Sequence, residues 1–301
     1  MVKFLRHLQA QEGSTLLYIT LVLPILLSIA GLTLDAGNLY WQQRRMQIAA
    51  DAAALGGTGE VARGNTEGAI NSAIQSLAIV NGADNVAWEY SDPNLGIHVE
   101  TSYTFDTYFA GIMGYTFLTV QAVSEAQVVP IASMGNLLPM TTMCDDMDSD
   151  ADPGFTYGVT YTLWDSNPTA PGNVGWLDWN GGSNGASELA DNIANPSNSG
   201  MWAVGDWIPS APGVKNSSNV RQAMDSWIGH TITMPLYDQV TGNGSNTEYR
   251  VCSFAAFTLT DYNFKGKNKW VKGSFVRTLK RGGGTNGVVP DFGLRTVRFV
   301  Q

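Results

Sequence analysis

The segment that most constrains this chain is an uncharged apolar run near its N-terminus, from Gly13 to Leu34. A helix of this run is about 33 Å long, close to the ~30 Å thickness of the hydrocarbon layer of a bilayer. Pro24 lies in its middle, where a membrane helix tolerates proline better than a soluble helix does. The run therefore predicts a transmembrane helix over residues 13–34, with residues 1–12 as a cytoplasmic tail.

The orientation of this helix is predicted from composition more than from flanking charge. Lys3 and Arg6 precede the run, but Arg44 and Arg45 match them in number, so the positive-inside rule gives only weak support for a cytoplasmic N-terminus. Charged residues make up only 14% of the chain, against about 25% in an ordinary soluble domain. A surface of Gly, Asn, Ser and Thr is typical of an exported protein, so we expect the C-terminal region to be extracytoplasmic.

A cleavable signal peptide is the competing interpretation of the same segment. Leu16–Leu27 has the length of a signal-peptide core, and Ser28-Ile-Ala30 resembles a small-residue cleavage site. The apolar run does not stop at Ala30, however, which favours a retained helix.

The helical pattern continues beyond the apolar run, from Asp35 to Leu55, without proline. The whole helix would be about forty residues, or ~60 Å, long, and Gly56-Gly57 predicts its end. A tether needs only ~20 apolar residues, so we expect one face of this helix to be an assembly surface that packs against neighbouring subunits. The face consists of apolar and small residues at helical spacing: Gly31, Leu39, Met46, Ala49, Ala50 and Ala53.

The order of these features resembles a known family. Gly13-Ser14, the proline-containing run, the stretch Gly31–Tyr40 and the stretch Gln47–Leu55 are similar to the TadE/TadG-like family of tight-adherence (Flp) pilus assembly proteins. The resemblance is specific over 13–57 and extends more loosely to about residue 130, through Asp106–Gly114 and Val120–Val128.

This resemblance implies a pilin-like anchor in a bacterial cell membrane that assists or forms a surface pilus. Its partners would be other pilin-like subunits, further copies of itself and the lipid bilayer, and it implies no catalytic residues. A prepilin peptidase site needs Glu at the fifth position after the cleaved glycine, and after Gly13 that position is Tyr18. The unprocessed TadG-like branch therefore fits better.

The remainder of the chain predicts an α+β fold, with a small pilin-like head at 35–130, a linker at 131–139 and a β-rich extracytoplasmic domain at 140–301. The head has a second amphipathic helix within 61–80 and strands at Val86–Tyr90, Ile97–Thr104 and Phe117–Val129. In the second domain we expect helices near Ala186–Ala194 and Asn219–Trp227, and strands at Thr156–Trp164, Thr231–Leu236, Glu248–Thr260, Lys269–Thr278 and Leu294–Val300.

Two cysteines, Cys144 and Cys252, are the whole cysteine content. An even, low count in an exported chain predicts one disulfide between them, with two unpaired core thiols as the alternative.

An acidic cluster follows Cys144, with carboxylates at Asp146, Asp148, Asp150 and Asp152. Such oxygen ligands suit calcium, but the spacing departs from an EF-hand, which would have Gly at Ala151 and Glu at Tyr157. The segment predicts either a calcium-binding loop or a solvated acidic linker.

Residues 261–301 hold nine of the seventeen Lys and Arg residues and only two acidic residues. This segment carries a net charge of +7, which leaves −16 on the rest. Solvated edge strands are the simpler interpretation, and an anionic partner surface is the alternative.

Other functions have weaker support in the sequence. Five tryptophans could form a sugar-binding platform of an adhesin, although core packing is the commoner fate of aromatic residues: Trp176, Trp179, Trp202, Trp207 and Trp227. Gly181–Gly185 matches a nucleophile elbow, in which Ser183 would need a histidine such as His230. We expect no enzyme and no nucleic-acid binding, with the adhesin as the first alternative and the serine hydrolase as a remote one.

Overall fold

The computed structural model describes residues 2–91, 95–144, 155–164, 175–181, 185–213, 215–266, 269–284 and 289–300, with side chains from residue 15 onward. The described part has an α+β fold with four α-helices and thirteen strands. The chain forms two compact units. The first unit contains Met1–Gly57, Asn71–Ser91 and Ile97–Glu125, and the second contains Thr58–Ile70, Asp92–Gly96 and Ala126–Gln301.

The long helix α1 (Val2–Arg63) is the main element of the first unit, and it continues through the predicted stop at Gly56-Gly57. These glycines instead let the second helix, α2 (Glu67–Val80), come close. A Cβ added at Gly56 would lie 2.1 Å from Leu77 Cδ1, and one at Gly57 would lie 2.5 Å from Ile74 Cγ1. The predicted helix end was wrong because close helix packing, and not a C-cap, requires glycine at these positions.

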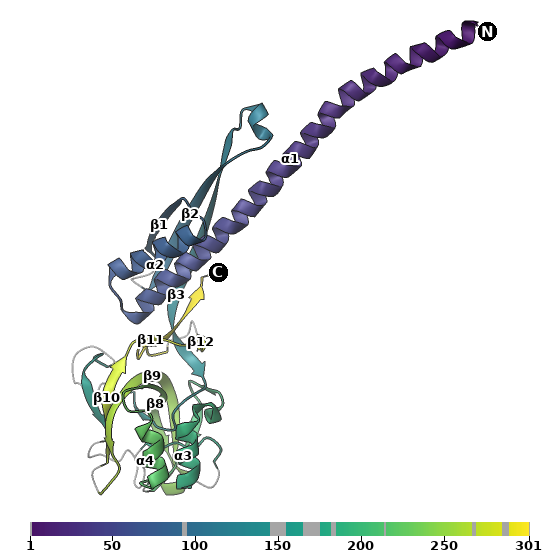
Figure 1. Ribbon diagram of the computed structural model, residues 1–301. Coiled ribbons are helices and arrows are strands. Elements are labelled where there is room, and N and C mark those ends of the chain that lie inside the picture. The colour runs from purple at the N-terminus through teal and green to yellow at the C-terminus, as the bar shows by residue number, and fades with distance from the viewer. Residues whose placement is uncertain are drawn as a thin grey trace. The chain divides into compact units, whose positions relative to one another are not determined.

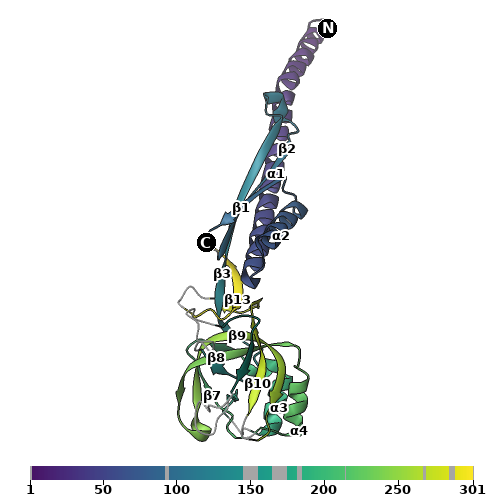
Figure 2. The same ribbon diagram turned by 90° about the vertical axis from the view of Figure 1, so that its left-hand side faces the viewer.

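Three antiparallel strands complete the first unit: β1 (Asn85–Tyr90), β2 (Gly96–Asp106) and the first half of β3 (Phe117–Met134). The order is β1-β2-β3, with Val86 of β1 opposite Thr101 of β2. A short 3₁₀ helix, η1 (Ala110–Met113), forms the tip of the β2–β3 hairpin. Figures 1 and 2 show α1 and α2 on the same face of this sheet, where alternate strand residues are buried.

The second unit is built around a six-stranded sheet in the order β4-β8-β9-β10-β5, with β7 also paired to β9. Its strands are β4 (Thr142–Met143), β5 (Thr160–Leu163), β7 (Trp207–Pro209), β8 (Thr231–Thr241), β9 (Glu248–Asn263) and β10 (Trp270–Val276). Helices α3 (Ala186–Ala194) and α4 (Ser218–Asp225) lie side by side on one side of the sheet (Figures 1 and 2).

The second unit also contains several shorter elements. They are β6 (Trp202–Ala203), β11 (Thr278–Leu279), β12 (Gly283–Gly284), β13 (Leu294–Phe299) and the 3₁₀ helices η2 (Pro196–Ser199) and η3 (Gly244–Asn246). Strands β6, β12 and β13 pair antiparallel with β3, and β11 pairs parallel with β13.

The segment predicted as a linker, 131–139, is instead part of the second unit. Ile131 and Met134 belong to β3, and Leu137 and Leu138 are fully buried in the core. Pro130, which suggested a boundary, lies within β3 opposite Arg295, at the end of the pairing with β13. A strand tolerates proline at such a position because the missing N–H interrupts little of the ladder.

Candidate functional site: the junction of the hairpin and the long helix

The tip of the β2–β3 hairpin is fastened to α1 by a single buried carboxylate. Asp35 accepts hydrogen bonds from three consecutive backbone N–H groups, those of Tyr108 (2.7 Å), Phe109 (2.9 Å) and Ala110 (2.6 Å). These donors lie at the start of η1, and hydrogen bonds to an ionised acceptor are stronger than neutral ones. Asp35 therefore fixes where along α1 the hairpin tip lies.

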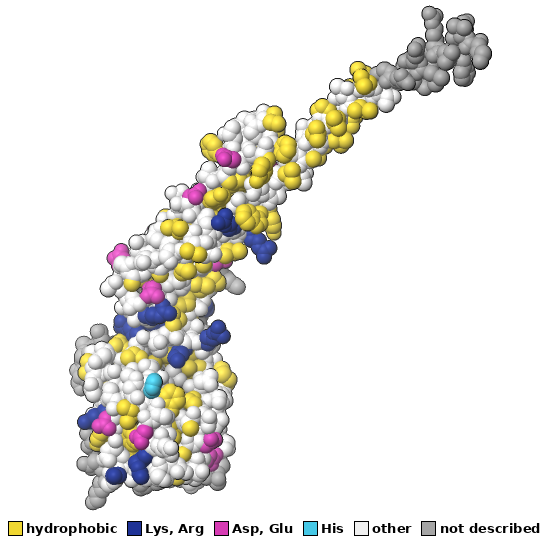
Figure 3. All heavy atoms as spheres, viewed as in Figure 1, with side chains coloured by type: hydrophobic (Ala, Val, Ile, Leu, Met, Phe, Trp, Pro, Cys, Tyr) yellow, Lys and Arg dark blue, Asp and Glu magenta, His cyan; other side chains and the backbone are white. Residues whose placement is uncertain are grey.

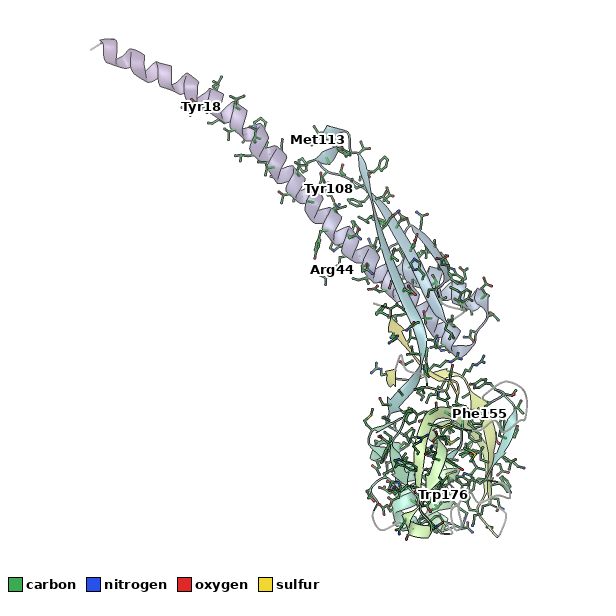
Figure 4. The ribbon with its side chains drawn as sticks, turned by 180° about the vertical axis from the view of Figure 1, so that it is seen from behind. Tyr18, Arg44, Tyr108, Met113, Phe155 and Trp176 are labelled. Carbon is green, nitrogen blue, oxygen red and sulfur yellow. A yellow bond between two sulfur atoms is a disulfide. The ribbon has the colours of Figure 1, made fainter. Side chains whose placement is uncertain are left out.

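A second contact lies one helical turn earlier, where the ring of Phe109 packs on Gly31. A Cβ at Gly31 would lie 2.4 Å from Phe109 Cγ, so the ring occupies the space that any other side chain would need. Figure 4 shows Tyr108 and Met113 at the end of the hairpin beside α1. Gly31 and Asp35 thus form the contact site on α1 for the tip of the hairpin, at the end of the apolar segment.

Hydrogen bonds from side chains also join the next turns of α1 to the sheet and to the end of α2. Gln43 Nε2 donates to the carbonyl of Gln121 (2.6 Å), and Gln47 Nε2 donates to the carbonyl of Val123 (3.0 Å). Arg45 Nε donates to the carbonyl of Asn81, which follows α2 (3.1 Å). The helix is therefore part of the folded head and is not a free tether.

The predicted assembly face of α1 faces the interior of the first unit. Met46, Ala49, Ala50 and Ala53 have no exposed surface, and Gly31 is covered by Phe109, while Leu39 remains partly exposed. The prediction that neighbouring subunits pack against the alanine face was wrong. The small side chains instead allow the subunit's own sheet and α2 to approach α1 closely.

The opposite face of α1 remains exposed and carries apolar residues seven positions apart. Trp41 is 56% exposed and Ile48 is 51% exposed, and Leu55 continues the same row. Leu27 and Leu34 extend it into the apolar segment at the same spacing. A seven-residue repeat places side chains on one stripe of a helix. We call Trp41, Ile48 and Leu55 the outer row.

The apolar part of α1 is long and apolar enough to cross a membrane. Its best 18-residue window has a mean hydropathy of 2.3, and only 6% of that window is buried. The hydroxyls of Thr20, Ser28 and Thr33 each donate to the carbonyl four residues earlier. Their polar atoms are thereby satisfied within the helix, as a lipid environment requires.

Comparison with known proteins supports the family suggested by the sequence in this same segment. Residues 13–63 match the family described as putative Flp pilus-assembly TadE/G-like. The match confirms the predicted resemblance for α1 and includes Gly31, Asp35 and the outer row, whereas residues 64–130 lie outside it. No curated protein and no solved structure matches the chain.

In the second unit, Cys144 and Cys252 form a disulfide. It joins the end of β4 to β9, and the backbone N–H of Cys144 also donates to the carbonyl of Tyr237 in β8 (2.7 Å). The predicted calcium ligands Asp146, Asp148, Asp150 and Asp152 lie outside the described residues, so calcium binding stays a prediction. Among the described residues, no group of three or more His, Cys, Asp or Glu side chains is arranged to hold a metal ion.

The residues considered for a hydrolase site or a sugar platform give these functions little structural support. Ser183 of the predicted elbow is not among the described residues, and His230 is exposed directly before β8. Trp176 is fully buried, and the half-buried Trp227 donates its indole N–H to the carbonyl of Ile193 (2.9 Å). Even Trp207, the most exposed of the five tryptophans, is only 38% exposed, which favours core packing over a sugar platform.

An ion pair of the second unit, between Asp238 and Arg250, shifts the pKa of both side chains. The guanidinium of Arg250 donates to both carboxylate oxygens of Asp238 across β8 and β9. These hydrogen bonds lower the pKa of Asp238 below its usual value, although burial opposes the shift. The same bonds raise the pKa of Arg250.

Proposed function

We propose that this chain is an envelope-anchored, pilin-like subunit that forms or helps to assemble a Tad/Flp-type pilus or a similar surface filament, without enzymatic activity. The observation that carries the proposal is the coincidence of the family match with α1, whose outer row of exposed apolar side chains continues beyond the membrane-length segment. A helix that served only as a tether would need no apolar row outside the lipid.

In this proposal the chain crosses the bacterial cell membrane once, with its N-terminus in the cytoplasm and the remainder on the outer side. The low charge content and the disulfide support this orientation, because disulfides persist in oxidising compartments.

Assembly takes place through the outer row and not through the alanine face. Single exposed apolar residues are common on protein surfaces. Trp41, Ile48 and Leu55, in contrast, lie on one stripe that continues the stripe of Leu27 and Leu34. Such a stripe fits a second helix of similar character, supplied by another copy of the chain or by another pilin-like subunit.

The test is recovery of partners from membranes of a cell that makes the filament. Ile48→Lys places a charge in the centre of the outer row without touching the core, so we expect recovery of cross-linked partners to fall on the order of tenfold. Val80→Lys is the matched control, since Val80 is an exposed apolar residue on α2, away from this row. Equal recovery from wild type and Ile48→Lys would exclude the outer row as the assembly surface.

A further inference from the structure

The tip of the β2–β3 hairpin exposes a group of large apolar side chains. Ile112 is 86% exposed and Met113 is 67% exposed, and the neighbouring aromatic residues Tyr108, Tyr115 and Phe117 are also exposed. The sequence carries no charged residue between Asp106 and Glu125. We call these five residues the apolar tip. A charge-free patch of this kind on a water-exposed loop marks a contact surface.

The position of the apolar tip is fixed relative to the membrane segment. Asp35 holds the backbone of Tyr108, Phe109 and Ala110, and the ring of Phe109 rests on Gly31. Both contacts involve the last turn of the apolar segment and the residue that follows it. The tip therefore lies at the level where α1 leaves the hydrocarbon layer, and Figure 3 shows hydrophobic side chains both on the hairpin end and on the adjoining stretch of α1.

Most backbone N–H groups of the tip donate to acceptors within the protein, as entry into lipid requires. The N–H groups of Ile112, Gly114 and Tyr115 donate to the carbonyls of Phe109, Gly111 and Ala110, each at 3.1 Å. The N–H of Thr107 donates to the carbonyl of Thr116 (3.1 Å), and Asp35 accepts from the N–H groups of Tyr108, Phe109 and Ala110 at the start of η1. These donors need no water.

We propose that the apolar tip is a second membrane contact, inserted into the interfacial layer of the outer leaflet beside α1. Tyrosines suit the headgroup level, and Ile112, Met113 and Phe117 suit the boundary with the acyl chains. The inference rests on the proposed membrane span of α1. The head is then attached to the bilayer at two points, which restricts how far it can tilt relative to the membrane.

The test uses the full chain reconstituted in phosphatidylcholine vesicles, with one cysteine carrying an environment-sensitive fluorophore. The native cysteines are joined as a disulfide and do not react. Ile112→Cys reports on the tip and Leu26→Cys on the proposed span. Val80→Cys is the control, because Val80 is exposed near Arg45, about 15 Å along the helix from Asp35.

Phospholipids brominated in their acyl chains quench fluorophores that reach the bilayer. We expect quenching and a blue-shifted emission at positions 112 and 26, and neither at position 80. Quenching at 26 with none at 112 would overturn the second contact while leaving the span intact. A blue shift at 112 without quenching would also overturn it, since that result means that protein, such as a second copy of the chain, covers the tip. Absence of quenching at 26 would overturn the span itself and the inference with it.

Discussion

Two glycines of α1, Gly31 and Gly37, lie within two turns of each other and have opposite surroundings. A Cβ at Gly31 would overlap the ring of Phe109, whereas a Cβ at Gly37 would meet nothing within 4 Å. Glycine is unfavourable in a helix interior by roughly 1 kcal/mol relative to alanine. The cost is offset at Gly31 by the contact with the hairpin.

This contrast gives a matched pair of substitutions. Gly31→Ala should displace Phe109 and loosen the bonds to Asp35, so we expect faster amide hydrogen exchange at Tyr108, Phe109 and Ala110, on the order of tenfold. Gly37→Ala should leave these amides unchanged, because the new methyl group is unopposed. Unchanged, slow exchange at all three amides in Gly31→Ala would show that the ring of Phe109 can move aside without weakening the hydrogen bonds to Asp35.

A pH-dependent contribution to stability is expected from Asp238 in the second unit. Its pKa in the folded protein is lowered, chiefly by the hydrogen bonds from Arg250, so the contribution is present above the unfolded value of about 3.9 and is lost as the pH falls through the folded value. The pair is about one-third exposed, so its worth is at most about 1 kcal/mol. Urea unfolding should show wild type more stable than Asp238→Asn at neutral pH, with the difference vanishing in acid. A difference that persists undiminished in acid would contradict this account.

At the scale of elements, the approach of α2 to α1 depends on Gly56 and Gly57. Gly57→Ala should push Ile74 out of the core and destabilise the first unit by about 1–3 kcal/mol, as overpacking does. Ile74→Ala makes room for the added methyl group, so the double variant should be less destabilised than the sum of the single ones. Gly68→Ala on α2 is the control, since its Cβ meets only a threonine hydroxyl at 3.9 Å. Strict additivity in a chemical denaturation cycle would mean that the glycine is not required for packing.

Most elements could be predicted from periodicity, because their patterns depend on neighbouring residues alone. The helix Ala186–Ala194 was predicted with the bounds observed, and strands β1, β2 and β9 were predicted to within a few residues. The continuation of α1 beyond Leu55 could not be predicted, because it depends on what packs against Gly56 and Gly57.

The candidate site was predicted less completely for the same reason. The small-residue face of α1 was recognised, but the sequence does not tell whether the subunit or a neighbour covers Ala49, Ala50 and Ala53. The role of Asp35 was missed, although a single acid directly after an apolar run was a usable signal. Its partners at 108–110 are more than seventy residues away.

For the whole molecule, the two units suggest that stability can be changed in one without the other. The disulfide lies in the second unit and closes a loop with a sequence separation of 108 residues. Chain entropy assigns such a bond up to about 4–5 kcal/mol. The double variant Cys144→Ser, Cys252→Ser should therefore unfold its second unit at a lower denaturant concentration, with faster hydrogen exchange in β8 and β9.

Exchange in α2 and β1 of the first unit should not change in that variant. Reduction of the wild-type protein should reproduce the effect, which separates the loss of the bond from the effect of serine. Identical unfolding of oxidised and reduced protein would show that the disulfide does not stabilise the fold.

The bonds from Gln43 and Gln47 to β3 also bear on how a filament of such subunits would grow and come apart. A polymer that extends by adding strands needs an edge strand whose backbone N–H and C=O groups are unpaired. In β3 the carbonyls of Gln121 and Val123 already accept hydrogen bonds from side-chain amides of the same molecule. We therefore expect β3 to be a poor template for strand exchange or amyloid-like growth. A filament assembled through helix–helix packing should instead dissociate in mild detergent into folded subunits that can reassemble.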